Sequence, residues 1–306
     1  MVKNIFLLFG LIPIFTFAQT PKVSSGSIKH FQSFQSKYVT ARNVDVWLPD
    51  GYTPKKKYAV LYMQDGQALF DSAVAEDKLE WGVDETFAKL INERKIKNCI
   101  VVGVWNTGKL RHSDYFPQKP FETISKPKQD SLYKIIFNGV LMMSEKVQSD
   151  NYLKFVVKEL KLFIDNKFST LKDKGNTFIA GSSMGGLISM YAVCEYPDVF
   201  GGAACLSTWW PGLLPSAKNP IPLAFNQYLQ TNMPPGKSHK LYFDTGTTGF
   251  DIYIKPLQPN VDTIILNKGY SAENFLSREF KGAGHSGKFW RERLEIPIIF
   301  LLENKR

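Results

Sequence analysis

The sequence predicts an α/β protein in which a mostly parallel central sheet carries helices on both faces. Apolar runs of strand length alternate along the chain with segments of helix length, which is the order of elements that such a sheet requires. The chain has 306 residues, enough for one large domain. Its 44% of apolar and 22% of charged residues are ordinary for a globular protein and exclude disordered, collagen-like and coiled-coil chains.

Seven strands are predicted from short apolar runs that end at turn residues. Residues 44–48 alternate between apolar and polar side chains and stop at a Pro-Asp-Gly turn. Residues 58–63 and 99–105 are nearly continuous apolar runs, as expected of strands buried on both faces. The other strands are expected at 178–180, 203–206, 240–244 and 275–280.

Four helices are predicted between and after these strands. Residues 152–168 place apolar side chains at helical spacing, which indicates an amphipathic helix. Residues 85–91 and 187–194 are expected to form shorter helices. Residues 292–302 are expected to form a closing helix that is broken near Pro297, because proline lacks the N–H that a helix interior needs.

Two stretches do not follow this alternation and are predicted to be insertions over the active edge of the sheet. Residues 107–150 are longer than the usual connection of an α/β unit, so we expect a cap or wall there. Residues 209–238 are rich in Pro, Trp and Asn, and we expect them to form a second wall made of loop.

The N-terminus predicts a secretory signal peptide. Lys3 provides a positive charge, residues 5–17 are apolar or nearly so, and Thr16 and Ala18 are small residues at the positions that a signal peptidase reads. We expect cleavage after Ala18, which leaves a single exported domain of residues 19–306 in the periplasm or outside the cell. The apolar run is too short for a membrane anchor, and no cysteine follows it for a lipid anchor.

Charge and cysteine usage predict neither a nucleic-acid partner nor a metal site. The net charge is +10, but the lysines are scattered, and their one tight run, at 55–57, lies in a predicted loop. Nucleic-acid binding would need clustered charge and a reading motif. Cys99, Cys194 and Cys205 lie in apolar contexts without the spacing of metal ligands, so we expect buried, inert thiols.

A Gly-x-Ser-x-Gly motif at residues 181–185 predicts a nucleophilic serine at position 183. The motif follows a predicted strand and precedes a predicted helix. At the tip of such a turn the serine hydroxyl is exposed, and the flanking positions must lack side chains because they pass close to the backbone. The turn also points N–H groups of the new helix at the place where oxyanion charge develops. Ser182 is the weaker candidate because it is not midway between two glycines.

A serine nucleophile needs a base, and the four histidines of the chain allow elimination. His30 lies in the N-terminal segment, His112 in a basic loop, and His239 at the sheet edge opposite the active one. His285 follows the last predicted strand, at the carboxyl edge where open α/β sheets place their sites. We therefore predict that His285 is the general base.

The third member of the predicted triad is a carboxylate between the serine and the histidine, after the strand that ends at Asp244. Asp244, Asp251 and Asp262 are the candidates. Asp244 ends the strand itself, so the following turn can engage its side chain, and Asp262 lies further on, in a segment expected to be helical. Asp251 follows the turn, where a loop can bend back toward His285. We predict Asp251, with Asp244 second.

Three motifs together are typical of one family of proteins. They are Gly-Ser-Ser-Met-Gly-Gly at 181–186, Tyr-Met-Gln-Asp-Gly-Gln-Ala-Leu-Phe-Asp at 62–71 and Glu-Trp-Gly-Val-Asp at 80–84. From about residue 44 to residue 302 the chain resembles the putative esterase family of α/β-hydrolases. That family includes esterase D, enterochelin esterases, carbohydrate esterases acting on feruloyl or acetyl groups, and the mycobacterial antigen 85 mycolyltransferases. The resemblance implies the α/β-hydrolase fold, with no metal or organic cofactor.

The resemblance also implies the oxyanion hole. In such proteins the residue after the Asp-Gly pair supplies one N–H group, which implies Gln67, and the residue after the nucleophile supplies the other, which implies Met184. The acid lies a few residues beyond a Gly-Thr turn, which matches Asp251. Relatives often carry an acidic residue where this chain has Gly287, and a histidine where it has Gln64, and both departures bear on substrate preference.

Several aromatic and charged side chains near the active edge are candidates for substrate contact. Aromatic rings can stack on a sugar or a phenolic acyl group. Aromatic residues at strand ends also cap cores, and charged residues also make structural hydrogen bonds, so both interpretations stay open. The candidates are Asp65, Trp81, Trp105, Arg111, Trp209 and Trp210.

These observations predict an exported serine carboxylic-ester hydrolase that works through a Ser-His-Asp triad and an acyl-enzyme. Its expected substrate is a small acyl, feruloyl or acetyl ester of a carbohydrate, or a siderophore ester. An acyltransferase of the antigen 85 type would use the same triad and pass the acyl group to an alcohol. A non-catalytic binding module is the third alternative, and such a protein would be expected to have lost a triad member.

Overall fold

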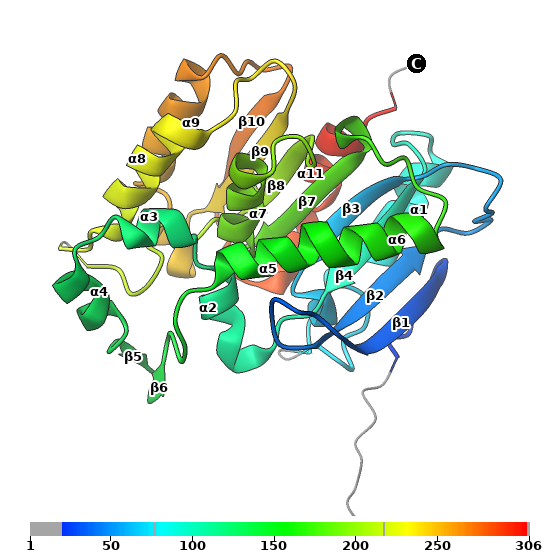
Figure 1. The fold of residues 1–306 in the computed structure, drawn as a ribbon. Helices are drawn as coiled ribbons and strands as arrows, with labels where there is room; N and C mark the ends of the chain where they lie inside the picture. The colour runs from blue at the N-terminus through cyan, green and yellow to red at the C-terminus, as the bar shows by residue number, and fades with distance from the viewer. Residues whose placement is uncertain (1–19, 76–77, 217, 305–306) are drawn as a thin grey trace, which may run out of the picture.

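The computed structural model describes residues 20–75, 78–216 and 218–304. Eight strands form one sheet in the order β1-β2-β4-β3-β7-β8-β9-β10 (Figure 1). The pairs β1–β2 and β2–β4 are antiparallel, and the five other pairs of neighbours are parallel. The prediction of a mostly parallel α/β sheet is therefore confirmed. The predicted signal peptide and its cleavage site lie outside the described residues.

All seven predicted strands are present, with ends that differ from the prediction by at most two residues. The eighth, β1, was not predicted because it is an edge strand with largely polar side chains, so it lacks the apolar run of the inner strands. The strands are β1 Ser27–Phe34, β2 Arg42–Leu48, β3 Ala59–Gln64, β4 Cys99–Val104, β7 Thr177–Ser182, β8 Gly202–Leu206, β9 Lys240–Gly246 and β10 Phe275–Phe280.

The sheet has a hydrophobic core on each face, because successive side chains of a strand point to opposite sides. Along β3, Val60 and Tyr62 face one core, whereas Leu61 and Met63 face the other. The first core packs against α5 (Ser149–Phe155), α6 (Lys161–Lys167), α7 (Met184–Glu195) and α8 (Ile221–Asn232). The second packs against α1 (Val83–Asn92) and α11 (Glu295–Leu302). This two-sided burial explains why β3 and β4 have nearly continuous apolar sequences.

The predicted helix at 152–168 has an interruption. A single π turn, Val156–Leu160, joins α5 to α6, and the two helices lie end to end across one face of the sheet (Figure 1). The closing segment was predicted with its break in the wrong place. Helices α10 (Gly287–Arg293) and α11 meet at Leu294, and Pro297 lies in the first turn of α11, where a missing N–H breaks no hydrogen bond.

The two expected insertions contain regular structure. Residues 209–238 were predicted to be a loop wall, but they hold α8, which buries side chains at helical spacing. Within 107–150 lie α2 (Arg111–Tyr115), α3 (Gln118–Glu122), α4 (Lys126–Leu132) and a small hairpin of β5 (Ile136–Phe137) and β6 (Val140–Leu141), which extends from the body beside α4 (Figure 1). His112, expected in a loop, therefore lies on α2.

Among the described residues, no helix has the length and apolar character needed to cross a membrane. Cys99, Cys194 and Cys205 are free and buried, as the sequence predicted. Burial raises the pKa of all three thiols, so they are protonated and unreactive at neutral pH.

Candidate active site

Ser183 lies at the sharp turn between β7 and α7. Its backbone has φ 57° and ψ −121°, a conformation that is costly for a residue with a side chain. Gly181 explains how the turn closes, since a Cβ atom there would lie 2.7 Å from the backbone carbonyl carbon of Gly185. Gly181 is thus required by close packing on the backbone of Gly185, whereas a Cβ atom at Gly185 would lie 3.1 Å from the Gln64 side chain. The strained turn presents the Ser183 hydroxyl at the carboxyl edge of the sheet.

The structure brings Ser183, His285 and Asp251 into contact. The His285 Nε2 atom lies 2.8 Å from Ser183 Oγ, and His285 Nδ1 lies 2.6 Å from Asp251 Oδ1. Because the carboxylate can only accept, Nδ1 carries the proton and Nε2 is left to accept from the serine hydroxyl. Asp251 belongs to a 3-10 turn after β9, Gly249–Tyr253, and His285 follows β10. Three segments far apart in sequence therefore form one chain of hydrogen bonds.

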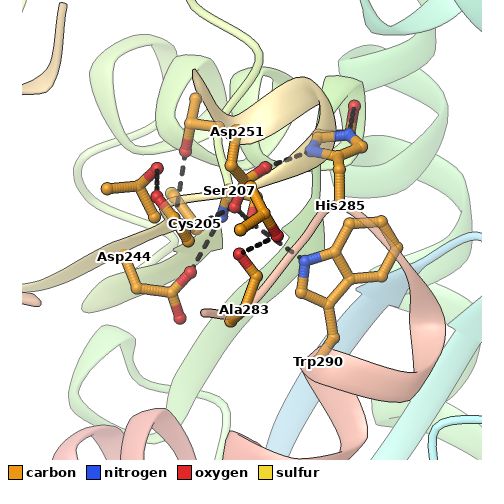
Figure 2. A network of polar contacts seen from close by, with 12 residues as sticks. Cys205, Ser207, Asp244, Asp251, Ala283, His285 and Trp290 are labelled. Carbon is orange, nitrogen blue, oxygen red and sulfur yellow. Dashed lines mark hydrogen bonds and ion pairs between the residues drawn. The ribbon is translucent and has the colours of Figure 1, made fainter. Parts of the chain in front are cut away.

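Asp251 is fully buried and accepts several hydrogen bonds (Figure 2). Its Oδ2 atom accepts from the Ser207 hydroxyl at 2.8 Å and from the Gly246 N–H. Burial alone would raise the pKa of Asp251. The hydrogen bond and charge of His285, together with the donors at Gly246 and Ser207, outweigh burial and hold that pKa below its usual range. The carboxylate is therefore charged at neutral pH and able to stabilise a protonated His285.

The two other candidate acids are engaged elsewhere. Asp244 accepts two hydrogen bonds from Arg293, at 2.8 and 3.1 Å. Asp262, on α9 (Gln258–Asn267), accepts from the side chains of Gln258 and Ser277. Neither carboxylate takes the place beside His285 that Asp251 occupies.

The other histidines lie in surroundings of their own, away from Ser183. His30 lies 2.6 Å from Asp45, on the two antiparallel strands at one edge of the sheet. His239 contacts the carbonyl of Pro197 at 2.8 Å. His112 is largely enclosed on α2, beside Arg111. Of the four histidines, His285 is the one that lies against Ser183.

The two residues implied for the oxyanion hole both lie in the first turn of a helical segment. Met184 is the first residue of α7, and Gln67 lies in a 3-10 turn, Gly66–Ala68, directly after β3. The first N–H groups of a helix have no intrahelical acceptor, so both can bind a ligand. Gly66 packs on β4, where a Cβ atom would lie 2.6 Å from the Gly103 carbonyl carbon, and this close approach fixes the position of the Gln67 turn.

A cleft of about 320 Å³ opens beside Ser183 and His285. Three of the six candidate substrate contacts line it: Asp65, Trp81 and Arg111. Arg111 donates two parallel hydrogen bonds of 2.8 Å to the Asp65 carboxylate, which also accepts from Asn106 at 2.8 Å. The cleft therefore combines a rigid, charged wall with the aromatic face of Trp81.

The three other candidates, Trp105, Trp209 and Trp210, are not among the residues that line the cleft. Trp105 donates its indole N–H to Asp45 and packs beneath the Gln67 turn. Trp210 is almost fully buried and donates to Gln258 at 2.7 Å, which favours the structural one of the two interpretations left open for it. Trp209 is buried with its ring 5.6 Å from that of His285, so it supports the histidine.

Sequence reasoning missed several residues around His285. The Trp290 ring lies 5.1 Å from the His285 ring and lines the cleft, and Asn106 lines it next to Arg111. Asn106 follows a predicted strand at the active edge, so its position alone could have indicated that it lines the site. Trp290 and Ser207 carry no such signal, because their roles depend on how α10 and the end of β8 pack against the 3-10 turn that carries Asp251.

An exposed apolar surface adjoins the other side of His285. The Phe250 ring lies 6.2 Å from the His285 ring and 6.4 Å from the Phe137 ring of the β5–β6 hairpin. Seven of the 11 large exposed hydrophobic side chains in the described residues belong to this hairpin and to the 3-10 turn that carries Phe250. This is an unusual concentration next to a reactive centre. They are Ile136, Phe137, Val140, Leu141, Phe250, Ile252 and Tyr253.

Among the residues that the structure describes, one group of carboxylates could hold a cation, and it does not include Asp251. Oxygen atoms of Glu80, Asp84 and Glu85 lie within 4.8 Å of one another near the start of α1. Arg291 already pairs with Glu80, and Ser24 donates to Asp84 at 2.7 and 2.9 Å. The hydrogen bonds that join Ser183, His285 and Asp251 need no metal.

Comparison with known families agrees with this geometry. The family model described as "Putative esterase" matches residues 37–295. The chain belongs to this family. Its site residues Ser183, His285 and Asp251 all lie within the matched range.

Curated relatives of this esterase-family chain are distant. The protein YjcH of Bacillus subtilis, described as uncharacterized, is 23% identical over 178 residues, which cover 58% of this chain and 60% of that protein. The endo-1,4-beta-xylanase/feruloyl esterase of Xylanibacter ruminicola is 26% identical over 203 residues, or 62% of this chain and 23% of that protein. The chain thus spans at most about 60% of the length of these relatives.

Solved structures share the fold. The enterochelin esterase from Shigella flexneri has a TM-score of 0.66 at 14% identity, covering 92% of this chain and 60% of that one. The ferulic acid esterase AmCE1/Fae1A from Anaeromyces mucronatus has a TM-score of 0.61 at 18% identity, covering 93% and 92%. These likenesses place the sheet and helices described above among the α/β-hydrolases.

Proposed function

We propose that this member of the Putative esterase family is a serine carboxylic-ester hydrolase. The observation that carries the proposal is the position of the His285 ring, which lies 2.8 Å from Ser183 Oγ and 2.6 Å from the buried Asp251 carboxylate. This arrangement can remove a proton from a serine hydroxyl and stabilise the imidazolium that results. Family membership supports the same reaction class.

In the proposed mechanism, Ser183 Oγ attacks the ester carbonyl carbon while its proton passes to His285 Nε2. The N–H groups of Gln67 and Met184 donate to the oxyanion of the tetrahedral intermediate, each worth roughly 2.7–4 kcal/mol in the transition state. His285 then gives its proton to the departing alcohol oxygen as the C–O bond breaks and an acyl-enzyme forms. Water attacks the acyl-enzyme with His285 again as base, and the carboxylic acid leaves as the Ser183 hydroxyl is restored.

We infer from the surroundings of Ser183 that the substrate is an ester with an apolar or aromatic part. Phe250 and the β5–β6 hairpin offer apolar contact on one side of His285, and Trp81 offers an aromatic face in the cleft. Relatives described as acting on ferulic acid and enterochelin esters support feruloyl, acetyl or siderophore esters as the substrates to test first. The apolar N-terminal segment supports export after cleavage near Ala18.

A fluorophosphonate probe and an ester panel test this proposal. The probe should label the wild-type protein and not the Ser183→Ala variant, and turnover of the best ester should fall on the order of 10⁴–10⁶-fold in that variant. The panel comprises p-nitrophenyl acetate, methyl ferulate, acetylated xylan and a catecholate siderophore. Adding a competing alcohol separates hydrolysis from acyl transfer by its products. Comparable turnover by Ser183→Ala would refute the assignment.

A further inference from the structure

The buried hydroxyl of Ser207 connects the triad acid to a second, buried ion pair. Ser207 lies just after β8, fully buried, with its side chain between Asp251 and Trp290 (Figure 2). Its Oγ atom contacts Asp251 Oδ2 at 2.8 Å, Arg293 Nη2 at 2.8 Å and Trp290 Nε1 at 3.0 Å. We propose that Ser207, held by Arg293, is a positioning residue that orients Asp251 toward His285.

The hydrogen-bond inventory fixes the direction in which Ser207 donates. A serine hydroxyl has one proton to donate and two lone pairs that accept. Arg293 and Trp290 can only donate, so they occupy the two lone pairs of Ser207 Oγ. The single hydroxyl proton must then point at the remaining partner, Asp251 Oδ2. Two N–H donors thus force Ser207 to act as a donor to the triad acid.

The Arg293–Asp244 pair keeps Ser207 in this place. Both side chains are almost fully buried, and the guanidinium of Arg293 donates to both oxygens of Asp244. Asp244 also accepts the backbone N–H of Ser207 at 2.9 Å and the Tyr242 hydroxyl at 2.9 Å. Ser207 is therefore bound through its backbone and its side chain to one rigid pair, and its φ of 42° is a strained conformation that these bonds maintain.

The arrangement affects the charge state of Asp251. Asp251 accepts from His285 through one oxygen, and from Ser207 and the Gly246 N–H through the other. The titratable and charged groups that face this cluster are His285 before α10, Arg293 on α10, and Asp244 with Tyr242 on β9. Removing the Ser207 donor should raise the pKa of Asp251, because the ionised carboxylate loses a hydrogen bond. A more basic Asp251 carboxylate also binds the Nδ1 proton of the protonated His285 ring more strongly.

The test compares Ser207→Ala and Ser207→Gly with the wild type in pH profiles of kcat/KM on p-nitrophenyl acetate. We expect kcat to fall roughly 10- to 100-fold, as for the loss of one hydrogen bond to a charged group. The acidic limb should move to higher pH, and KM should stay unchanged because Ser207 does not line the cleft. Ser207→Gly removes the same hydroxyl without backbone strain, since glycine accepts the positive φ of this position.

Ser189→Ala is the matched control. Ser189 is also fully buried, and its hydroxyl donates to the Gly185 carbonyl within α7 rather than to Asp251. It should leave the acidic limb in place. The proposal is overturned if both Ser207 variants keep kcat within about 2-fold of the wild type, or if Ser189→Ala moves the limb as far as they do.

The proposal rests on the hydrolase function, so a second readout is independent of turnover. NMR of histidine-labelled protein follows protonation of the His285 ring directly. The midpoint of that transition should move to higher pH in Ser207→Ala and remain in place in Ser189→Ala. An equal midpoint in Ser207→Ala and the wild type would refute the positioning role, whether or not an ester substrate is found. Failure of the fluorophosphonate probe to label wild-type Ser183 would refute the hydrolase proposal alone.

Discussion

Two histidine–aspartate pairs of this chain share one distance and differ in what lies beyond the ring. In each pair a histidine Nδ1 atom lies 2.6 Å from an aspartate oxygen, in His30–Asp45 and in His285–Asp251. Beyond His285 lies the Ser183 hydroxyl. The Nε2 atom of His30 is buried, and within the described residues it has no hydrogen-bond partner. A histidine held by a carboxylate is thus insufficient for catalysis, because the base needs a nucleophile within reach.

This difference gives a matched pair of substitutions. His285→Gln should lower turnover of the best ester on the order of 10⁴-fold or more, since it removes the group that takes the serine proton. His30→Gln should keep comparable turnover, although it breaks a similar contact to an aspartate. Steady-state kinetics and fluorophosphonate labelling of both variants measure the effect. Equal losses in the two variants would show that His285 has no special role as the base.

At the scale of elements, the sequence predicted those helices and strands whose apolar residues follow a single clear pattern. The strands β3 and β4 are apolar throughout because both faces are buried, so they could be recognised from sequence. Edge strand β1 could not be recognised, because its side chains are largely polar and none of them is buried, so it lacks an apolar run. Helix α8 does carry apolar residues at helical spacing, but the Pro-rich sequence before it indicated a loop. The break between α10 and α11 depends on packing, which no local signal reports.

The β5–β6 hairpin leads to a prediction about substrate preference. Phe137 and Val140 are cross-strand partners, and Phe137 contacts Phe250 beside His285. Replacing both hairpin residues with serine should leave kcat/KM for p-nitrophenyl acetate unchanged, because an acetyl ester is too short to reach them. For p-nitrophenyl decanoate we expect a loss of roughly 10-fold, since an apolar chain loses contact area.

Leu223→Ser is the control for this experiment. Leu223 is 63% exposed, similar to Val140 at 65%, but it lies on α8 and not on the hairpin that contacts Phe250. The Leu223→Ser substitution should leave kcat/KM unchanged for both esters. If the hairpin variant lowers the rates on acetate and decanoate esters equally, the hairpin supports the structure of the site and does not select the ester.

At the scale of the whole molecule, the sequence predicted the order of elements and the residues that meet at the site. The glycine spacing around Ser183 and the place of His285 after the last strand reflect general rules of α/β sheets, so the contact between them could be expected. The side chains that hold Asp251 and His285 in place could not be predicted from the sequence. Ser207 follows β8, whereas Trp290 and Arg293 lie on α10, more than 80 positions further along the chain, and their contacts exist only after the sheet and α10 have packed together.

Two largely enclosed histidines, His112 and His239, make the stability of the folded protein depend on pH. Burial, with the neighbouring Arg111 charge, lowers the pKa of His112 from its ordinary value of 6.5 to about 4. Burial also lowers the pKa of His239, at the opposite edge of the sheet. In both cases the folded protein favours the neutral ring. At these two positions the unfolded chain therefore binds more protons as the pH falls below 6.5, and the contribution of the two rings to stability decreases in that direction.

For His112, the direction of the stability change and its pH range follow from the ordinary pKa of 6.5 and the folded-state pKa of about 4. Its contribution is fully present above pH 6.5 and is lost as the pH falls toward 4, with a loss of about 2 kcal/mol between pH 7 and pH 5. Urea unfolding at pH 7 and pH 5 measures the difference in the free energy of unfolding. His112→Gln, which cannot be protonated, should lose about 2 kcal/mol less than the wild type over the same interval. If His112→Gln loses as much stability as the wild type, the protein does not hold His112 neutral, and the packing of α2 against the cleft is looser than the structure implies.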